Sequence, residues 1–160
     1  MDDLYYMDKA LELAKEAAAE GEVPVGCVVV CKDQIVGMGR NRRETGKTAL
    51  GHAEIEAIAQ ACENLGGWRL WECTLYVTLE PCPMCAGAIV NARIPRVVYG
   101  ASDSKCGACG SVCNLFSMEF NHHPQVEKGI REAQCGALLK EFFQNLRVEL
   151  KTRPKWKKNP

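Results

Sequence analysis

Apolar residues recur every three or four positions near both ends of the chain, which is the spacing of amphipathic helices. The first such stretch covers residues 3–20 and stops at Gly21, and glycine commonly follows the last turn of a helix. The second covers residues 135–150 and carries two adjacent phenylalanines. We therefore expect a helix at each end of the chain, each with one face packed on another element.

Four short apolar runs lie between these two stretches, and their β-branched residues predict strands. The runs cover residues 23–31, 35–38, 74–79 and 96–100. The first two are separated by a short polar turn that contains Lys32-Asp33, which predicts a hairpin.

Two further helices are expected between the strands, at residues 53–62 and 83–92, whereas residues 39–51 and 101–125 are predicted to be loops. The second helix joins two predicted strands, and a strand–helix–strand unit implies a parallel pair with a crossover. Ligands in open α/β sheets collect beyond the carboxyl ends of the strands. The turn at residues 80–83 is therefore the expected place for a site.

Length and composition favour one domain. The chain has 160 residues, of which 47% are hydrophobic, so residues 1–160 are expected to form a single domain with a substantial core. Its 20 basic and 20 acidic residues cancel, so no global field indicates an acidic partner or a membrane surface. The acidic, amphipathic start does not resemble a secretory signal, and no apolar run approaches the roughly 20 residues of a membrane span. A cytoplasmic location is expected.

The chain contains ten cysteines. In a reducing compartment such residues serve as metal ligands, buried thiols or redox groups more often than as a disulfide framework. No disulfide is predicted.

Three potential metal ligands stand at the starts of two predicted helices. His52 opens one helix, and Cys82 and Cys85 open the other, where Pro83 is the expected first helical residue. Structural zinc sites usually have four protein ligands, whereas catalytic sites have three and leave one position for water. The positive end of the helix dipole also favours thiolates. This set therefore predicts a catalytic zinc site.

Glu54 lies two residues after the predicted imidazole ligand. A zinc ion lowers the pKa of its bound water from 15.7 to roughly 7, and a nearby carboxylate can take the water's proton and pass it to a leaving nitrogen. The predicted chemistry is hydrolytic attack on an amidine-like carbon with loss of ammonia.

A second Cys-x-x-Cys pair leaves an alternative open. Cys106 and Cys109 follow Cys85 at a spacing that would suit a four-cysteine structural zinc site together with Cys82. Such a non-catalytic module would leave His52 and Glu54 without a role. Cys113 lies nearby, and the simpler interpretation is that the thiols at 106–113 are ordinary reduced cysteines in a loop of small residues.

The metal-ligand motifs belong to a longer pattern that covers nearly the whole chain. It includes His52-Ala53-Glu54, Thr78–Ile89, Val97–Ala101 and Asn114-Leu115. In these segments the chain resembles the zinc deaminases of the cytidine deaminase superfamily, and within it the bacterial tRNA-specific adenosine deaminases, whose known signature these motifs are.

The resemblance implies a fold, a reaction and partners. The fold would be a three-layer α/β/α domain on a mixed five-stranded sheet, and the protein would be a homodimer. The reaction would convert adenosine to inosine at the wobble position of tRNA, with the anticodon stem-loop as partner and one zinc ion per subunit. The alternative is a deaminase of a free nucleobase or nucleotide, of the guanine or cytosine type.

The same resemblance assigns substrate contacts. Asn41 would hydrogen-bond the flipped adenine, the backbone of Ala53 would help to read it, and Asp103 and Lys105 would meet the flanking nucleotides. His122 would pack in its loop or contact RNA. Without the resemblance, Asn41 would be interpreted as a turn-stabilising residue and Asp103 as a solvated loop charge.

The end of the chain, residues 151–160, is a basic tail with five basic residues and no acidic one. Such a cluster can neutralise phosphates, so RNA contact is expected there.

Overall fold

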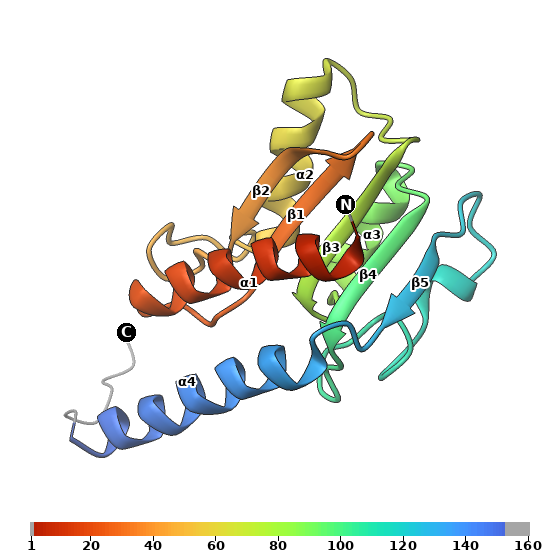
Figure 1. The fold of residues 1–160 in the computed structure, drawn as a ribbon. Helices are drawn as coiled ribbons and strands as arrows, with labels where there is room; N and C mark the ends of the chain where they lie inside the picture. Colours follow the sequence, from red (N-terminus) through yellow and green to blue (C-terminus); the bar gives the residue numbers. More distant parts are fainter. Residues whose placement is uncertain (1, 153–160) are drawn as a thin grey trace, which may run out of the picture.

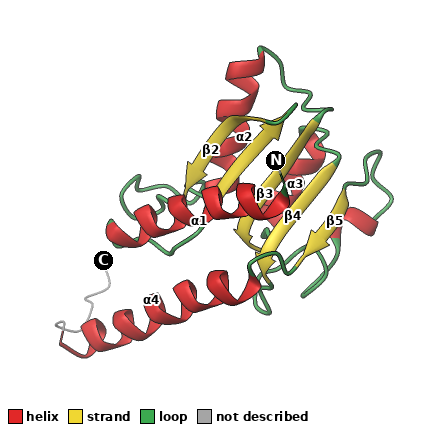
Figure 2. Cartoon of the chain, in the orientation of Figure 1, coloured by secondary structure: helices red, strands yellow, loops and turns green. Residues whose placement is uncertain are grey.

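The structure is a computed structural model that describes residues 2–152. Figure 1 shows the arrangement of its helices and strands, and Figure 2 distinguishes them by colour. In chain order they are α1 (Asp3–Ala19), β1 (Gly26–Cys31), β2 (Gln34–Arg40), α2 (Ala53–Leu65), β3 (Cys73–Leu79), α3 (Pro83–Asn91), β4 (Arg96–Ala101), the short 3-10 helix η1 (Leu115–Ser117), β5 (Gln125–Lys128) and α4 (Glu132–Thr152). Most of the predicted basic tail lies outside the described residues.

The five strands form one mixed sheet in the order β2-β1-β3-β4-β5. β1 pairs antiparallel with both β2 and β3, while β3 with β4 and β4 with β5 are parallel. The predicted hairpin and the predicted parallel crossover are both confirmed. The hairpin turn places Lys32 and Asp33 at positive φ values of 50° and 61°, which suits the twist of a two-residue connection.

Helices cover both faces of the sheet (Figure 1). Along β1, Cys27 and Val29 belong to the core cluster that includes residues of α2 and α3, whereas Val28 and Val30 belong to the cluster that includes α1. This alternation follows from the two-residue period of a strand. The predicted three-layer α/β/α architecture is therefore confirmed. Within residues 2–152, no helix has the length and apolar character needed to cross a membrane.

Three elements differ from the prediction. β1 begins at Gly26 rather than at Val23, because Pro24 interrupts the run and Val25 donates instead to the Val23 carbonyl. β5 was not predicted, and only its first residue, Gln125, falls in the stretch predicted to be a loop. All four of its residues are exposed, and it is held as an edge strand by β4.

The third difference concerns α4, which was predicted to pack through a long apolar face. Only Cys135 is buried along this helix. The helix runs past the sheet (Figure 1), and its residues after Cys135, as far as Thr152, are exposed or half-buried.

Candidate active site

Two helix N-termini bring the three predicted ligands together at the carboxyl end of β3. His52 is the N-cap of α2, and Cys82 is the N-cap of α3 with Pro83 at its first turn. The Nδ1 atom of His52 lies 3.5 Å from the Sγ atom of Cys82 and 3.5 Å from that of Cys85. Among residues 2–152 this is the one group of three or more such side chains suited to holding a metal, with all ligand atoms within 4.8 Å of one another.

In this arrangement the pKa values of the two thiols are shifted in opposite directions. The Cys85 thiol hydrogen-bonds the Cys82 sulfur and, together with His52, lowers the pKa of Cys82 to about 4. The same contact with Cys82, followed by burial, raises the pKa of Cys85. The hydrogen bond with Cys82 raises the pKa of His52. The cluster therefore carries a thiolate beside an imidazole, which is a donor set for a soft or borderline cation.

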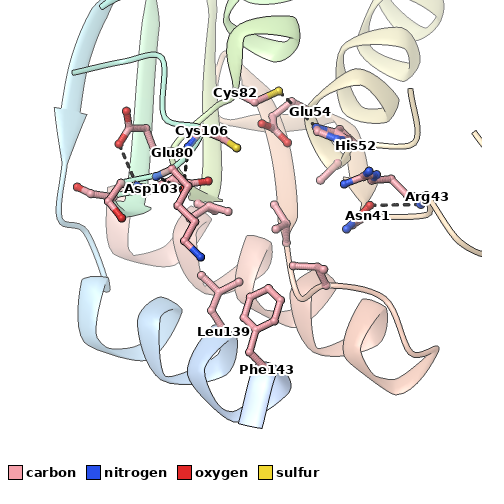
Figure 3. A pocket seen from close by; sticks show the side chains of 17 residues that line it. Asn41, Arg43, His52, Glu54, Glu80, Cys82, Asp103, Cys106, Leu139 and Phe143 are labelled. Atoms are coloured by element: carbon pink, nitrogen blue, oxygen red, sulfur yellow. Dashed lines mark hydrogen bonds between the residues drawn. The ribbon is translucent and has the colours of Figure 1, made fainter. Parts of the chain in front are cut away.

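Glu54 lies in the first turn of α2 and points toward the cluster (Figure 3). Its side chain is only 4% exposed. Burial raises the pKa of Glu54 to about 7, so the carboxyl group can both accept and release a proton near neutral pH.

A close approach of β2 to α2 places this helix N-terminus. A Cβ atom at position 39 would overlap the carbonyl oxygen of Ala53, so only glycine allows the strand to lie this near the first turn. Gly37 meets the next turn of α2 in the same way, at the Ala57 carbonyl. The two glycines thus allow α2 to pack closely on β2, and this packing sets the distance of His52 and Glu54 from the sheet.

A cavity of about 530 Å³ opens beside the ligand cluster (Figure 3). This volume lies within the range of about 300–1,000 Å³ that is typical of small-molecule sites. The cavity contains residues predicted to contact substrate and others that were not. Its lining residues are Val23, Val25, Asn41, Arg43, His52, Ala53, Glu54, Leu79, Glu80, Cys82, Ser102, Asp103, Ser104, Lys105, Cys106, Leu139 and Phe143.

Asn41 stabilises a turn and also lines the cavity. Its Oδ1 atom accepts a hydrogen bond of 3.3 Å from the backbone N–H of Arg43, so it stabilises a turn. It also lines the cavity, and a side-chain amide carries an NH₂ donor besides the oxygen.

Asp103 likewise shapes its loop rather than standing as a solvated charge. Its Oδ1 accepts from the backbone N–H groups of Lys105 and Cys106 at 3.0 and 3.1 Å. Asp103 and Lys105 both line the cavity.

Glu80 stabilises the loop that carries Asp103, and this role was not predicted. It is 2% exposed, and its carboxylate accepts hydrogen bonds from the backbone of Asp103, Cys109 and Ser111 and from the Ser111 hydroxyl. A Cβ atom at Gly107 would collide with this carboxylate, so glycine leaves the space that it fills. One signal in the sequence was its position directly before Pro81 at the end of a buried strand.

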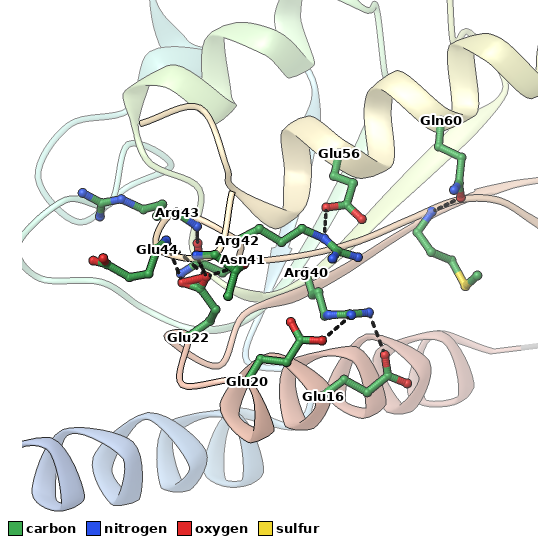
Figure 4. A network of polar contacts seen from close by, with 12 residues as sticks. Glu16, Glu20, Glu22, Arg40, Asn41, Arg42, Arg43, Glu44, Glu56 and Gln60 are labelled. Carbon is green, nitrogen blue, oxygen red and sulfur yellow. Dashed lines mark hydrogen bonds and ion pairs between the residues drawn. The ribbon is translucent and has the colours of Figure 1, made fainter. Parts of the chain in front are cut away.

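Glu22 stabilises in the same way the loop that carries Asn41 and Arg43 on the opposite wall of the cavity. This buried carboxylate accepts from the backbone N–H groups of Glu44 and Thr45 and from the Thr45 hydroxyl (Figure 4). Although its burial acts in the other direction, these hydrogen bonds lower the pKa of Glu22. The loop that carries Asn41 and Arg43 is therefore tied to the end of α1.

Three other residues singled out from the sequence lie outside the metal-ligand group: His122, Cys106 and Cys109. The Nε2 atom of His122 is 2.7 Å from the Ile94 carbonyl oxygen, and His122 is not among the residues that line the cavity. Cys106 lines the cavity but does not join Cys82 in a metal-binding group among the described residues, and neither does Cys109. The four-cysteine arrangement is therefore not formed.

Comparison with known proteins agrees with this geometry. The family described as MafB19-like deaminase matches residues 1–147. A protein of Bacillus subtilis (strain 168) named tRNA-specific adenosine deaminase is 48% identical over 150 residues, which are 93% of this chain and 93% of that protein.

Solved structures share the fold. One, described as a study of A-to-I editing by tRNA deaminases at the wobble position of transfer RNA, has a TM-score of 0.81 and 43% identity over 84% of this chain and 99% of its own. A guanine deaminase from Bacillus subtilis has a TM-score of 0.64 and 30% identity over 99% of each chain. With the metal-ligand group of His52, Cys82 and Cys85 beside a cavity that Glu54 also lines, this chain belongs to the MafB19-like deaminase family and to the tRNA-specific adenosine deaminases.

Proposed function

We propose that this protein converts adenosine to inosine at the wobble position of tRNA by hydrolytic deamination. The observation that carries the proposal is the group of three metal-ligating side chains beside a cavity that is lined by His52, Cys82 and the buried Glu54 carboxyl group. The relative at 48% identity is named for tRNA adenosine, whereas the guanine deaminase is more distant at 30%. The first substrate class is therefore favoured over a free base.

Zinc is the proposed metal. Zinc–sulfur and zinc–nitrogen bonds of about 2.3 and 2.0 Å in a tetrahedron place sulfur and nitrogen about 3.5 Å apart. The distances of 3.5 Å from His52 Nδ1 to both sulfur atoms match this value. Three protein ligands leave one position for water, and the ion, when bound, lowers the pKa of that water and so supplies a nucleophile near neutral pH.

Glu54 moves the protons in the proposed reaction. Its carboxylate takes a proton from the attacking water as the oxygen adds to the amine-bearing ring carbon of adenine. It then delivers that proton to the amine nitrogen, which leaves as ammonia, while the second proton of the water ends on the adjacent ring nitrogen, so that the product is the carbonyl form of inosine. The burial of Glu54 excludes bulk water that would compete for this proton.

The walls of the cavity would hold the extruded base. Asn41 would donate its side-chain amide to the base, with the backbone of Ala53 beside it, while Asp103 and Lys105 would face the neighbouring nucleotides. Leu139 of α4 offers an apolar surface at the cavity rim (Figure 3). An anticodon loop already presents unstacked bases, which lowers the cost of extrusion.

The other expected partners belong to the same proposal. His122 would contact RNA only away from the cavity, since its imidazole is held at the Ile94 carbonyl. The basic tail at residues 151–160 would neutralise phosphates of the stem. We also propose that the enzyme acts as a homodimer in the cytoplasm.

A substitution of the proton carrier tests the mechanism. Glu54→Gln keeps the size of the side chain but removes its proton transfer, so inosine formation in a wobble-adenosine stem-loop should fall by about 10²–10⁴-fold. Zinc content, measured by mass spectrometry of the metal, should stay at one ion per subunit. Glu56→Gln is the matched control, because that carboxylate lies one half-turn away and pairs with Arg42 rather than with the cluster.

Full activity of the zinc-loaded Glu54→Gln protein would contradict the mechanism. Loss of zinc in that variant would indicate that Glu54 is itself a metal ligand. That result would contradict its proposed role as proton carrier.

A further inference from the structure

Three cysteine thiols gather at the end of the sheet opposite the proposed active site. Cys31 is the last residue of β1, Cys73 is the first residue of β3, and Cys62 comes from the later part of α2. Cys73 belongs to the core cluster between the sheet and α2, and Cys31 and Cys62 pack against that same cluster. The catalytic cavity is instead lined by residues beyond the other end of β3, such as Glu80.

The strand register places two of these cysteines directly opposite each other. β1 and β3 are antiparallel, and Cys31 is the partner of Cys73 in their pairing. Opposite residues in such a ladder have Cα atoms about 4.5–5.5 Å apart. Disulfides form between residues whose Cα atoms are about 4.4–6.8 Å apart, so this pair meets the distance requirement without movement of the backbone.

Access to the pair differs between its members. Cys73 is 1% exposed, whereas Cys31 is only partly buried and both residues line a cleft of about 270 Å³. Lys32 and Arg69 bring positive charge to this cleft, and Glu72 pairs with the Lys32 ammonium group at 3.2 Å. A small polar oxidant can therefore reach Cys31 before it reaches Cys73.

Burial makes Cys73 and Cys62 weak acids. Burial, followed by the neighbouring charge of Cys31, raises the pKa of Cys73 to about 12. Burial also raises the pKa of Cys62. Because the thiolate is the nucleophile toward peroxides, these two thiols are poor first reactants.

We propose that Cys31 and Cys73 form a peroxide-responsive dithiol that closes reversibly to a disulfide across the β1–β3 ladder. In the first step the Cys31 sulfur attacks one oxygen of hydrogen peroxide, the O–O bond breaks, and the products are a sulfenic acid and water. In the second step the Cys73 sulfur attacks the Cys31 sulfur, the S–O bond breaks, and a second water leaves with the thiol proton. The two sulfur atoms together lose two electrons, which reduce both peroxide oxygens to the level of water.

The disulfide would tie two strands that are already paired, far from the residues proposed for catalysis. It would therefore stabilise the fold by closing the loop between residues 31 and 73, with little effect on the deamination rate. The inference is independent of the proposed function, because it concerns neither the cavity nor the metal ligands.

Peptide mapping of the full-length, zinc-loaded protein tests the proposal. The protein is treated with hydrogen peroxide, its remaining thiols are alkylated, and it is digested without reduction. The expected result is a cross-linked peptide pair that contains Cys31 and Cys73, with loss of two hydrogen atoms in the intact mass and full reversal by dithiothreitol. The melting temperature of the oxidised protein should rise by roughly 5 °C or more.

Two serine variants and a control separate the roles. Cys31→Ser should abolish the cross-link and the rise in melting temperature, whereas Cys73→Ser should leave a sulfenic acid at Cys31 that dimedone traps. Cys135→Ser is the control, because Cys135 is buried in the cluster on the other face of the sheet and should not affect the cross-link.

The proposal is overturned if peroxide oxidises other thiols while Cys31 and Cys73 are both recovered alkylated. It is equally overturned if Cys73 is recovered linked to Cys62, because the opposed pair would then not be the reactive one. Both results can be read on the unsubstituted protein, so they do not depend on the folding of any variant.

Discussion

Glu80→Gln is the substitution that most directly tests how the cavity wall is held. In the native protein one carboxylate oxygen, Oε1, accepts from the Asp103 N–H at 3.1 Å and from the Ser111 hydroxyl at 2.5 Å. The other, Oε2, accepts from the N–H groups of Cys109 and Ser111 at 3.0 and 3.2 Å. A glutamine of the same shape replaces one of these acceptors by an NH₂ donor.

The geometry decides which oxygen is replaced and sets the size of the effect. The amide nitrogen should occupy the Oε1 position, because the Ser111 hydroxyl can rotate to accept from it, whereas two backbone N–H groups at Oε2 cannot. The Asp103 N–H is then left without an acceptor, at a cost of about 1–3 kcal/mol. Loss of the charge weakens the remaining bonds, so the free energy of unfolding should fall by about 2–4 kcal/mol in total.

Urea unfolding at neutral pH measures this loss, and hydrogen exchange of the Asp103 amide locates it. Glu119→Gln, on an exposed side chain, is the control and should change stability by less than about 0.5 kcal/mol. The deamination rate on a stem-loop should also fall, because the loop that carries Lys105 loses its support. An unchanged urea midpoint and an unchanged Asp103 exchange rate would refute the reasoning.

The stability difference between the native protein and Glu80→Gln should depend on pH. Although burial acts in the other direction, hydrogen bonds from Ser111, Asp103 and Cys109 lower the pKa of Glu80 below its ordinary value of 4.5. The carboxylate therefore contributes stability that is fully present above pH 4.5 and is lost as the pH falls through the lower value in the folded state. The difference between native protein and Glu80→Gln should be largest at neutral pH and should shrink in acid.

Four further substitutions test other parts of the account. Gly39→Ala should lower the free energy of unfolding in urea by about 1–3 kcal/mol, because the added methyl group overlaps the backbone of α2; Gly136→Ala, in open space on α4, should instead raise it by about 0.5–1 kcal/mol. Asp3→Asn weakens the paired contacts to Arg96 at 2.7 and 2.8 Å and should cost about 1 kcal/mol, because solvent screens this partly exposed pair. Since the hydrogen bond from Arg96 lowers the pKa of Asp3 from 3.8 to about 2, that loss should be seen above pH 3.8 and should vanish as the pH falls toward 2. Cys85→Ala should bind less than one tenth of the zinc bound by the native protein, and a full zinc content by metal analysis would remove Cys85 from the ligand set.

Most of the fold could be predicted because its elements carry strong local patterns. The continuous apolar runs of β1, β3 and β4 mark strands buried on both faces, and the Pro83 helix between two of them implies the parallel crossover. β5 could not be located in this way. Its four exposed residues have no pattern of their own, and only the neighbouring edge of β4 makes them a strand.

The same distinction applies to the site. His52, Cys82 and Cys85 could be predicted to meet because each stands in the first turn or cap of a helix at the same end of the sheet. The buried carboxylates Glu22 and Glu80 could not, since their partners are backbone N–H groups of distant loops. The apolar face of α4 was interpreted as part of the core, because the sequence does not show where the helix lies. Its position in three dimensions brings Leu139 and Phe143 to the cavity.

The central claim is that this protein deaminates adenosine within an RNA loop, at the cavity beside His52, Cys82 and Cys85. The most direct measurement is ammonia release and inosine formation by the purified zinc-loaded protein on a wobble-adenosine anticodon stem-loop, compared at equal concentration with free adenine, guanine, cytosine and cytidine. The account predicts inosine from the stem-loop and little or no ammonia from the free compounds. Turnover of a free base with no reaction on the stem-loop would contradict the proposed substrate.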